Sequence, residues 1–294
     1  HYYSNRPSYE ELPLLTADGI VIPKAGLRNT LSNSELTNIV PTMAGSNRDE
    51  VKLWLASAKY FVDLDYSFLG SILGVPKVVI NDLEAFNIFN SYRSKAWKIR
   101  GVDFPLESLF ISGNKNLYAY RYDWDDHRKF IIADFKELIG AAHATEIPLI
   151  TGNMKLVGDY GFLIYPSGPS KRFTSKNMMR FWTNFAKNGT PGYSTNGKEW
   201  LNYKGSKNGD SNYMILDKRK NLGMMTDRFS FISLLQNLFK ESSVTDLEKC
   251  VIVLQMLTFV GDDLYDKYIN QYPGTCDRGK SEKFLIENAS FIDY

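Results

Sequence analysis

The most constraining feature of the sequence is a short apolar run followed by two adjacent carboxylates and then a helical pattern. Residues 38–45 (NIVPTMAG) read as a buried strand that ends at Gly45-Ser46-Asn47, just before Asp49 and Glu50. Apolar residues then recur at helical spacing, at Val51, Trp54, Leu55 and Ala58. Open α/β sheets carry their functional side chains just past the carboxyl ends of strands. The segment therefore favours an α/β fold. Asp49 and Glu50 could belong to a functional site, or they could only stabilise the first turn of a helix through its dipole.

Further segments fit the same architecture. Residues 117–122 alternate like a strand, residues 214–216 form a short apolar run, and residues 20–22 follow a tight turn as a short strand. A helix is expected over 130–139, and three more are expected from cap patterns. These begin at the capping-box pattern of residues 81–84, at Ser175 with Gly189 as the stop, and at the Thr245–Glu248 capping box.

Composition limits the classes of partner. The 294 residues are 44% hydrophobic and 23% charged with a net charge of +2, as in an ordinary soluble globular protein. This balance gives no reason to expect a nucleic acid as partner, and no run is long and apolar enough to span a bilayer. The chain starts with His1 rather than Met, so a missing targeting segment carries no information about its compartment.

The cysteines and the acidic residues do not indicate a metal site. Cys250 and Cys276 fit no metal-ligand spacing; they could form one disulfide, which would point to an extracytoplasmic or secreted protein, or remain two free thiols. Asp123, Asp125 and Asp126 lie close together, but no loop glycine or distal glutamate completes a calcium loop. The residues therefore predict neither a metal nor another cofactor. Residues 188–190 and 288–290 are glycosylation acceptors only if a eukaryote secretes the chain.

His143 is the best candidate for a general base among the three histidines. It follows Gly140, Ala141 and Ala142, whose small side chains leave the imidazole uncrowded. Histidine titrates near neutrality and can take up and return a proton during catalysis. A histidine packed in a turn is the alternative interpretation.

Three sequence blocks together resemble one family. They are residues 44–50 (AGSNRDE), residues 140–143 (GAAH) and residues 181–191 (FWTNFAKNGTP). Their order and spacing are similar to those of type-B carboxylesterases, the cholinesterase-like branch of the α/β-hydrolases, and the resemblance runs from about residue 13 to 217. It implies an α/β fold with the carboxyl-terminal part of an α/β-hydrolase sheet and flanking helices.

The resemblance also implies roles for particular residues in a carboxylic ester hydrolase. The family's triad acid corresponds to Glu50 and its triad base to His143, in the chain order known for this class. Glu146 matches an acidic position that the family keeps beside the histidine and is expected to support it. Leu53 and Trp54 match positions that line the acyl side of the substrate site, although Trp54 could equally be a core residue.

The nucleophile of such an enzyme is missing from the sequence. No G-x-S-x-G pentapeptide is present, since residues 45–47 and 70–72 both fail the spacing, and the glycine-rich oxyanion loop is absent too. Residues 1–294 are therefore expected to form the carboxyl-terminal portion of a single α/β-hydrolase domain. An upstream portion would supply the serine and the oxyanion hole, the substrate would be a small ester, and this chain alone would be inactive.

A different class of function is the alternative. Some relatives of this fold have lost catalysis and act as binding or adhesion modules. They usually lack the serine, the acid or the histidine, whereas Glu50 and His143 both stand where the family pattern requires them. The catalytic interpretation is therefore preferred.

Overall fold

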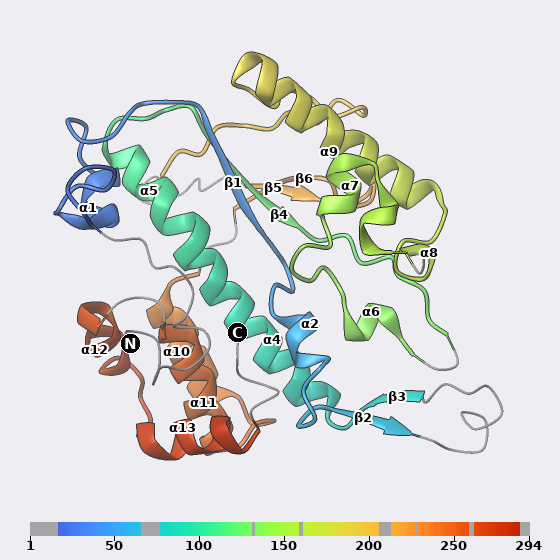
Figure 1. Ribbon diagram of the computed structural model, residues 1–294, viewed down its shortest axis with the longest axis vertical. Coiled ribbons are helices and arrows are strands. Elements are labelled where there is room, and N and C mark those ends of the chain that lie inside the picture. Colours follow the sequence, from blue (N-terminus) through green and yellow to red (C-terminus); the bar gives the residue numbers. More distant parts are fainter. Residues whose placement is uncertain are drawn as a thin grey trace.

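The computed structural model (Figure 1) describes residues 17–65, 77–130, 133–158, 161–205, 213–226, 229–258 and 262–288. Its main sheet has four strands in the order β1 (Thr42–Asn47), β4 (Leu117–Tyr122), β5 (Tyr213–Leu216) and β6 (Gly223–Met225). The first three of these run parallel, and β6 pairs antiparallel with β5. The chain therefore has the expected α/β fold, a mixed sheet with flanking helices.

Helices cover both faces of this sheet because successive strand residues point to opposite sides. On β4, Tyr118 and Tyr122 pack into a cluster with Phe181 of helix α9 (Pro169–Asn188). The intervening Ala119 packs on the other face, together with Leu106 of helix α5 (Phe104–Ile111). The strand expected over 117–122 is confirmed, and its alternation fixes the two apolar layers (Figure 1).

A long helical rod crosses one face of the sheet beside β1. It consists of α4 (Leu83–Lys98), the π-helical turn η2 (Ile99–Asp103) and α5. The side chain of Asp82 caps α4 by accepting a hydrogen bond from the Ala85 amide, so the cap lies one residue later than the expected Asn81. Pro105 stands in the first turn of α5, where its ring fixes a φ that suits a helix.

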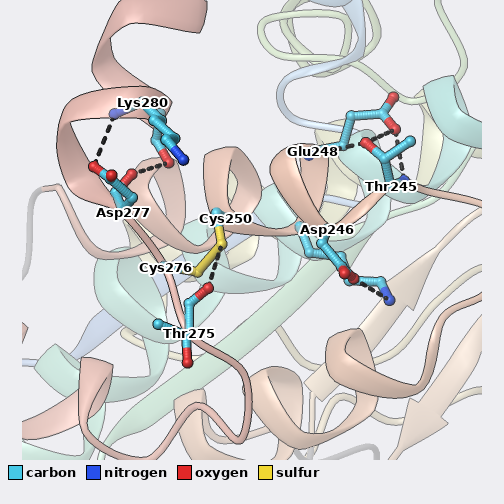
Figure 2. The surroundings of a disulfide bond; sticks show 10 residues. Thr245, Asp246, Glu248, Cys250, Thr275, Cys276, Asp277 and Lys280 are labelled. Atoms are coloured by element: carbon cyan, nitrogen blue, oxygen red, sulfur yellow. Dashed lines mark hydrogen bonds and ion pairs between the residues drawn. A yellow bond between two sulfur atoms is a disulfide. The ribbon is translucent and has the colours of Figure 1, made fainter.

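The carboxyl-terminal helices form a second apolar core with α4. These helices are α10 (Phe231–Lys240), α11 (Asp246–Leu257), α12 (Asp262–Ile269) and α13 (Arg278–Glu287). Thr245 and Glu248 form the expected capping box at the start of α11. Cys250 and Cys276 are bonded as a disulfide, which joins α11 to the segment just before α13 (Figure 2).

The remaining elements are short. Strands β2 (Val62–Asp65) and β3 (Lys77–Ile80) pair antiparallel as a separate two-stranded sheet. The short helices are α1 (Gly26–Leu31), α2 (Lys52–Leu55), α6 (Phe135–Leu138), α7 (Ile147–Thr151), η3 (Met154–Val157) and α8 (Gly161–Ile164). Over the described ranges, we find no helix with the length and apolar character needed to cross a bilayer.

Several expected boundaries were wrong. Ser175 caps no helix, because α9 already begins at Pro169 and the Ser175 hydroxyl donates a hydrogen bond to the Leu149 carbonyl inside the fold. The helix expected over 130–139 is reduced to α6, since Asp134 caps the chain there through the Glu137 amide. Residues 20–22 form bends rather than a strand, with their amides bound to Asp18.

The expected end of one helix is confirmed, the expected strand before Asp49 is partly confirmed, and some expected features lie outside the described residues. Gly189 ends α9 in a left-handed conformation, as expected. A strand does precede Asp49, but the expected bounds and burial of residues 38–45 were wrong. β1 begins at Thr42, just after Pro41, extends to Asn47, and is fully buried only at Ser46 and Asn47. Residues 70–72, His1 and residues 289–290 of one glycosylation acceptor lie outside the described residues.

Candidate active site

Two loops that follow neighbouring strands bring Glu50 and His143 together. Glu50 follows β1, and His143 lies in the connection that leaves β4. Because β1 and β4 are adjacent and parallel, their carboxyl ends lie at the same edge of the sheet. This strand order places the two side chains in one site although 93 residues separate them.

The contact between Glu50 and His143 is direct. The imidazole Nδ1 lies 2.8 Å from the Glu50 Oε2 atom, and the His143 amide donates a hydrogen bond to the Glu50 carbonyl at 3.1 Å. The other carboxylate oxygen accepts a hydrogen bond from the Asn47 amide at 2.7 Å. The Glu50 side chain is buried, whereas that of His143 is 47% exposed. The acid is therefore fixed inside the fold, and the imidazole reaches the surface.

This arrangement favours the protonated imidazole. The hydrogen bond to Glu50 raises the pKa of His143 above its ordinary value, partial burial opposes this rise, and the negative charges of Glu50 and Glu146 add to it. With Nδ1 engaged by the carboxylate, the Nε2 edge is where the ring would exchange a proton with a reactant.

The small residues before His143 have a packing role as well. Gly140 has a φ of 54°, and a Cβ atom there would lie 2.6 Å from a carboxylate oxygen of Asp49. The next amide, that of Ala141, donates a hydrogen bond to the same oxygen at 3.0 Å. Ala144, a non-glycine residue, also has a positive φ, 65°, so the loop turns tightly on both sides of the histidine.

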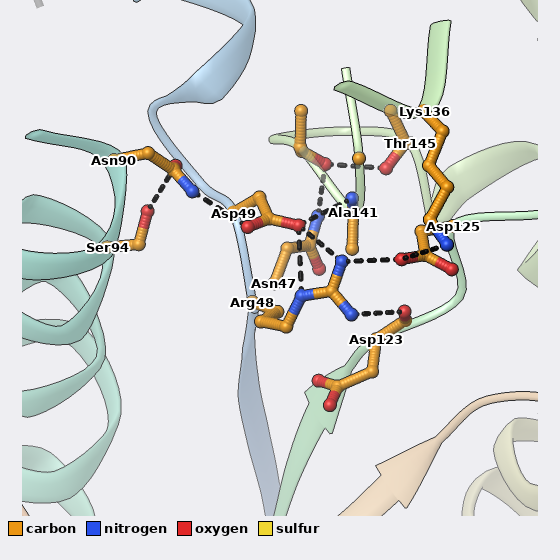
Figure 3. Close-up of polar contacts among 12 residues, drawn as sticks. Asn47, Arg48, Asp49, Asn90, Ser94, Asp123, Asp125, Lys136, Ala141 and Thr145 are labelled. Atoms are coloured by element: carbon orange, nitrogen blue, oxygen red, sulfur yellow. Dashed lines mark hydrogen bonds and ion pairs between the residues drawn. The ribbon is translucent and has the colours of Figure 1, made fainter. Parts of the chain in front are cut away.

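Asp49 anchors this loop, and Figure 3 shows its carboxylate among Arg48, Asn90 and Ala141. Its carboxylate binds the Ala141 amide, the Asn90 side chain at 2.7 Å, and Arg48 at 2.7 Å. Arg48 also reaches Asp125 at 2.9 Å, which links the end of β1 to the segment after β4. Burial works against ionisation of Asp49, but the charge of Arg48 lowers its pKa overall. Asp49 is thus a charged structural anchor.

Asn47 connects Glu146 to the same site. Its side-chain nitrogen donates to the Glu146 Oε2 atom at 2.5 Å and to the Ala142 carbonyl at 2.7 Å. Burial raises the pKa of Glu146, and the hydrogen bond from Asn47 only partly opposes that rise. Asn47 was not among the site residues expected from the sequence, although it lies in the 44–50 block. Its position at the end of a strand, three residues before the acid, was the available signal.

The two expected substrate residues lie on α2. Trp54 stacks on His143 with ring centroids 5.2 Å apart and an interplanar angle of 29°. Leu53, its neighbour, is 44% exposed. Trp54 is half-buried and also packs against the apolar core, which agrees with the core interpretation; its place in the substrate site stays a prediction.

His127 is a structural histidine. Its two ring nitrogens lie 2.5 Å from the Ile164 carbonyl and 2.7 Å from the Gly140 carbonyl, and the side chain is buried. Within the described part of the chain, no cluster of three His, Cys, Asp or Glu side chains could hold a metal ion.

The comparisons with known proteins agree with the resemblance seen in the sequence. Residues 102–232 match the model of the carboxylesterase family, which confirms the resemblance over that part of the chain. The matched residues include His143, whereas Glu50 lies before them. A search among curated proteins found none that matches the sequence.

Solved structures of esterases are distantly similar. A PNB esterase shares 18% identity at a TM-score of 0.49, covering 76% of this chain and 43% of its own. The carboxylesterase EST55 of Geobacillus stearothermophilus shares 18% identity at a TM-score of 0.46, covering 72% of this chain and 43% of its own. The chain thus spans less than half the length of these proteins. Because this similarity is low, the fold and the site are established by the strand order and the contacts of this chain and not by these solved structures.

Proposed function

We propose that residues 1–294 are the carboxyl-terminal portion of a serine carboxylesterase domain. In this proposal Glu50 is the triad acid and His143 the base, and an upstream portion supplies the nucleophilic serine and the oxyanion hole. The observation that carries the proposal is the 2.8 Å contact between a buried carboxylate and a half-exposed imidazole. The carboxylesterase match over residues 102–232 supports it.

The chemistry follows from the geometry of the pair. His143 takes the proton of the serine hydroxyl at Nε2 as the serine attacks the ester carbonyl, and then gives a proton to the departing alcohol. Glu50 holds the ring through Nδ1 and stabilises the imidazolium that forms. Because the Asn47 amide fixes the other Glu50 oxygen at 2.7 Å, the carboxylate cannot turn away when the ring becomes charged.

Glu146 has a supporting role in this proposal. It is held by Asn47 and contributes negative charge that favours the protonated form of His143. Glu146→Gln keeps an oxygen for the Asn47 amide but removes the charge. We therefore expect this variant to lower the pKa of His143 and to reduce the esterase rate by less than loss of the base does.

The test uses the assembled enzyme, in which this chain and the serine-bearing portion are both present. His143→Ala and Glu50→Gln should each reduce hydrolysis of a simple ester by orders of magnitude, as loss or neutralisation of a triad member does in serine hydrolases. Glu35→Gln is the matched control, since it neutralises an exposed glutamate far from the site in sequence. Full activity of the His143→Ala enzyme would contradict the role of His143 as the base. Absence of ester hydrolysis by the unaltered assembled protein would instead favour a binding or adhesion module.

A further inference from the structure

Two indole rings lie beside the imidazole of the proposed base. Trp54 lies 5.2 Å from the imidazole centroid, Trp97 lies 5.4 Å from it, and the two indoles are 5.9 Å apart. These distances form a nearly equilateral triangle. If the two indoles lay on opposite faces of the imidazole, their centroids would be about twice as far from each other as each is from the imidazole. Both indoles therefore lie to one side of His143. The His143 side chain is 47% exposed despite these two neighbours.

The three ring planes turn progressively. The imidazole and Trp54 planes differ by 29°, and the Trp54 and Trp97 planes differ by 25°. The sum of these two interplanar angles equals the 54° between the imidazole and Trp97 planes. The plane therefore turns in the same direction from the imidazole to Trp54 and from Trp54 to Trp97. Together the two indoles form a curved aromatic wall that begins at the catalytic pair.

Trp97 is held firmly in this wall. It lies in the last turn of α4, whose neighbouring residues Ala96 and Ile99 are buried in the core. The Arg100 guanidinium stacks over the Trp97 ring, 5.5 Å from its centroid. Trp97 itself is half-buried and packs against the same core, so its position is set before any ligand binds.

We propose that Trp54 and Trp97 select esters that carry a flat apolar group, with Trp97 as a specificity-determining residue. This inference rests on the proposed esterase function. The serine oxygen must come within about 3 Å of the His143 Nε2 atom to transfer its proton. A planar group one or two bonds from the ester carbonyl then reaches the indoles, which lie 5.2 and 5.4 Å from the imidazole centroid. Flat rings gain stacking contacts with indoles that puckered rings of equal carbon number do not.

The experiment compares matched esters in the assembled enzyme. One pair varies the acyl group, methyl benzoate against methyl cyclohexanecarboxylate, and the other varies the alcohol, benzyl acetate against cyclohexylmethyl acetate. For each pair, the measured quantity is the ratio of kcat/KM for the flat ester to kcat/KM for the puckered one. Taking this ratio within one enzyme cancels a general loss of catalytic activity. Comparing the ratio between variants cancels the different intrinsic reactivities of the two esters.

Trp97→Leu should lower this ratio for at least one pair by about three- to tenfold, the range expected for one aromatic contact. Trp97→Phe keeps a flat ring and should retain most of the ratio. If Trp97→Leu does not fold, Trp97→Met removes the flat ring while filling more of the space. The pair that responds identifies whether the wall receives the acyl or the alcohol group.

Two results would count against the inference, and they are distinguishable. Unchanged ratios in both pairs, with esters still hydrolysed, overturn the role of the wall and leave the esterase proposal intact. No hydrolysis of any of the four esters by the unaltered assembled enzyme overturns the esterase proposal and this inference with it.

Discussion

His143 is attached to Glu50 at two points, through its backbone amide at 3.1 Å and through its ring Nδ1 at 2.8 Å. The amide contact fixes the loop, and the ring contact fixes the imidazole plane. Glu50 follows β1 and His143 lies in the connection that leaves β4, so both contacts hold the histidine loop against the end of β1. The hydrogen bond from the Ala141 amide to Asp49 fixes the same loop.

The first prediction concerns pH. Glu50→Gln should lower the pKa of His143, because the hydrogen bond to Glu50 is the main cause of its rise. A raised pKa in the folded state means that the pair stabilises the fold below about pH 6.5, the ordinary histidine pKa, and that this contribution is lost as the pH rises through the folded pKa. The half-exposed ring limits the contribution to about 1 kcal/mol or less.

Two measurements check this prediction. The His143 ring resonances should titrate at lower pH in Glu50→Gln than in the unaltered protein and in Glu35→Gln. Urea unfolding should show a larger loss of stability for Glu50→Gln at pH 5.5 than at pH 9. An identical His143 titration with and without the carboxylate would show that the contact is absent in solution.

The second prediction concerns the close approach of β1 to β4. Gly45 pairs with Tyr120, and a Cβ atom on Gly45 would lie 2.3 Å from the Tyr120 ring. That ring cannot move aside, since it packs edge-on against Trp182 at 5.1 Å and Trp200 at 6.0 Å. Gly45→Ala should reduce the free energy of unfolding by about 1–3 kcal/mol, as overpacking does in cores.

The matched control is Gly223→Ala. Gly223 also lies in a strand of the same sheet, and a Cβ atom there meets nothing within 4 Å. Its effect on urea unfolding should therefore stay within about 0.5 kcal/mol. Equal effects of the two substitutions would mean that Tyr120 does not lie over Gly45.

The third prediction concerns the disulfide. Cys250 and Cys276 are 26 residues apart, so their bond restricts a loop of that length in the unfolded chain. Replacing both by alanine should lower the free energy of unfolding by about 3 kcal/mol on the loop-entropy estimate. A reducing agent should produce a similar loss in the unaltered protein and none in the double variant. Equal unfolding midpoints with and without reductant in the unaltered protein would contradict this.

The fourth prediction concerns the free edge of the sheet. Among the described strands, β1 pairs only with β4, and the preceding Ile39 and Val40 are 54% and 55% exposed. Open strand edges and exposed apolar surface promote association. Residues 1–294 expressed alone should therefore self-associate or bind a dye that fluoresces on apolar surface. Size and mass measurements showing a stable 33.6 kDa monomer without dye binding would contradict this.

Local patterns in the sequence were sufficient for several elements. The alternation of residues 117–122 predicted β4, Gly189 predicted the end of α9, and Thr245 with Glu248 predicted the start of α11. Each of these signals acts within one strand or one helical turn, so the residues that decide the structure are neighbours in the sequence. The resemblance to carboxylesterases likewise rested on short blocks of adjacent residues.

Tertiary contacts decided the rest. Ser175 resembles a cap in sequence, but its hydroxyl binds Leu149 of a different helix. The sequence offered Asp49 and Glu50 as adjacent carboxylates, and local pattern gives both the same position past a strand. Only the arrangement of β1 beside β4 separates them. It directs Asp49 to Arg48 and the backbone of the histidine loop, and Glu50 to the imidazole of His143. The physical reason is that a contact across 93 residues depends on strand order, which no local spacing contains.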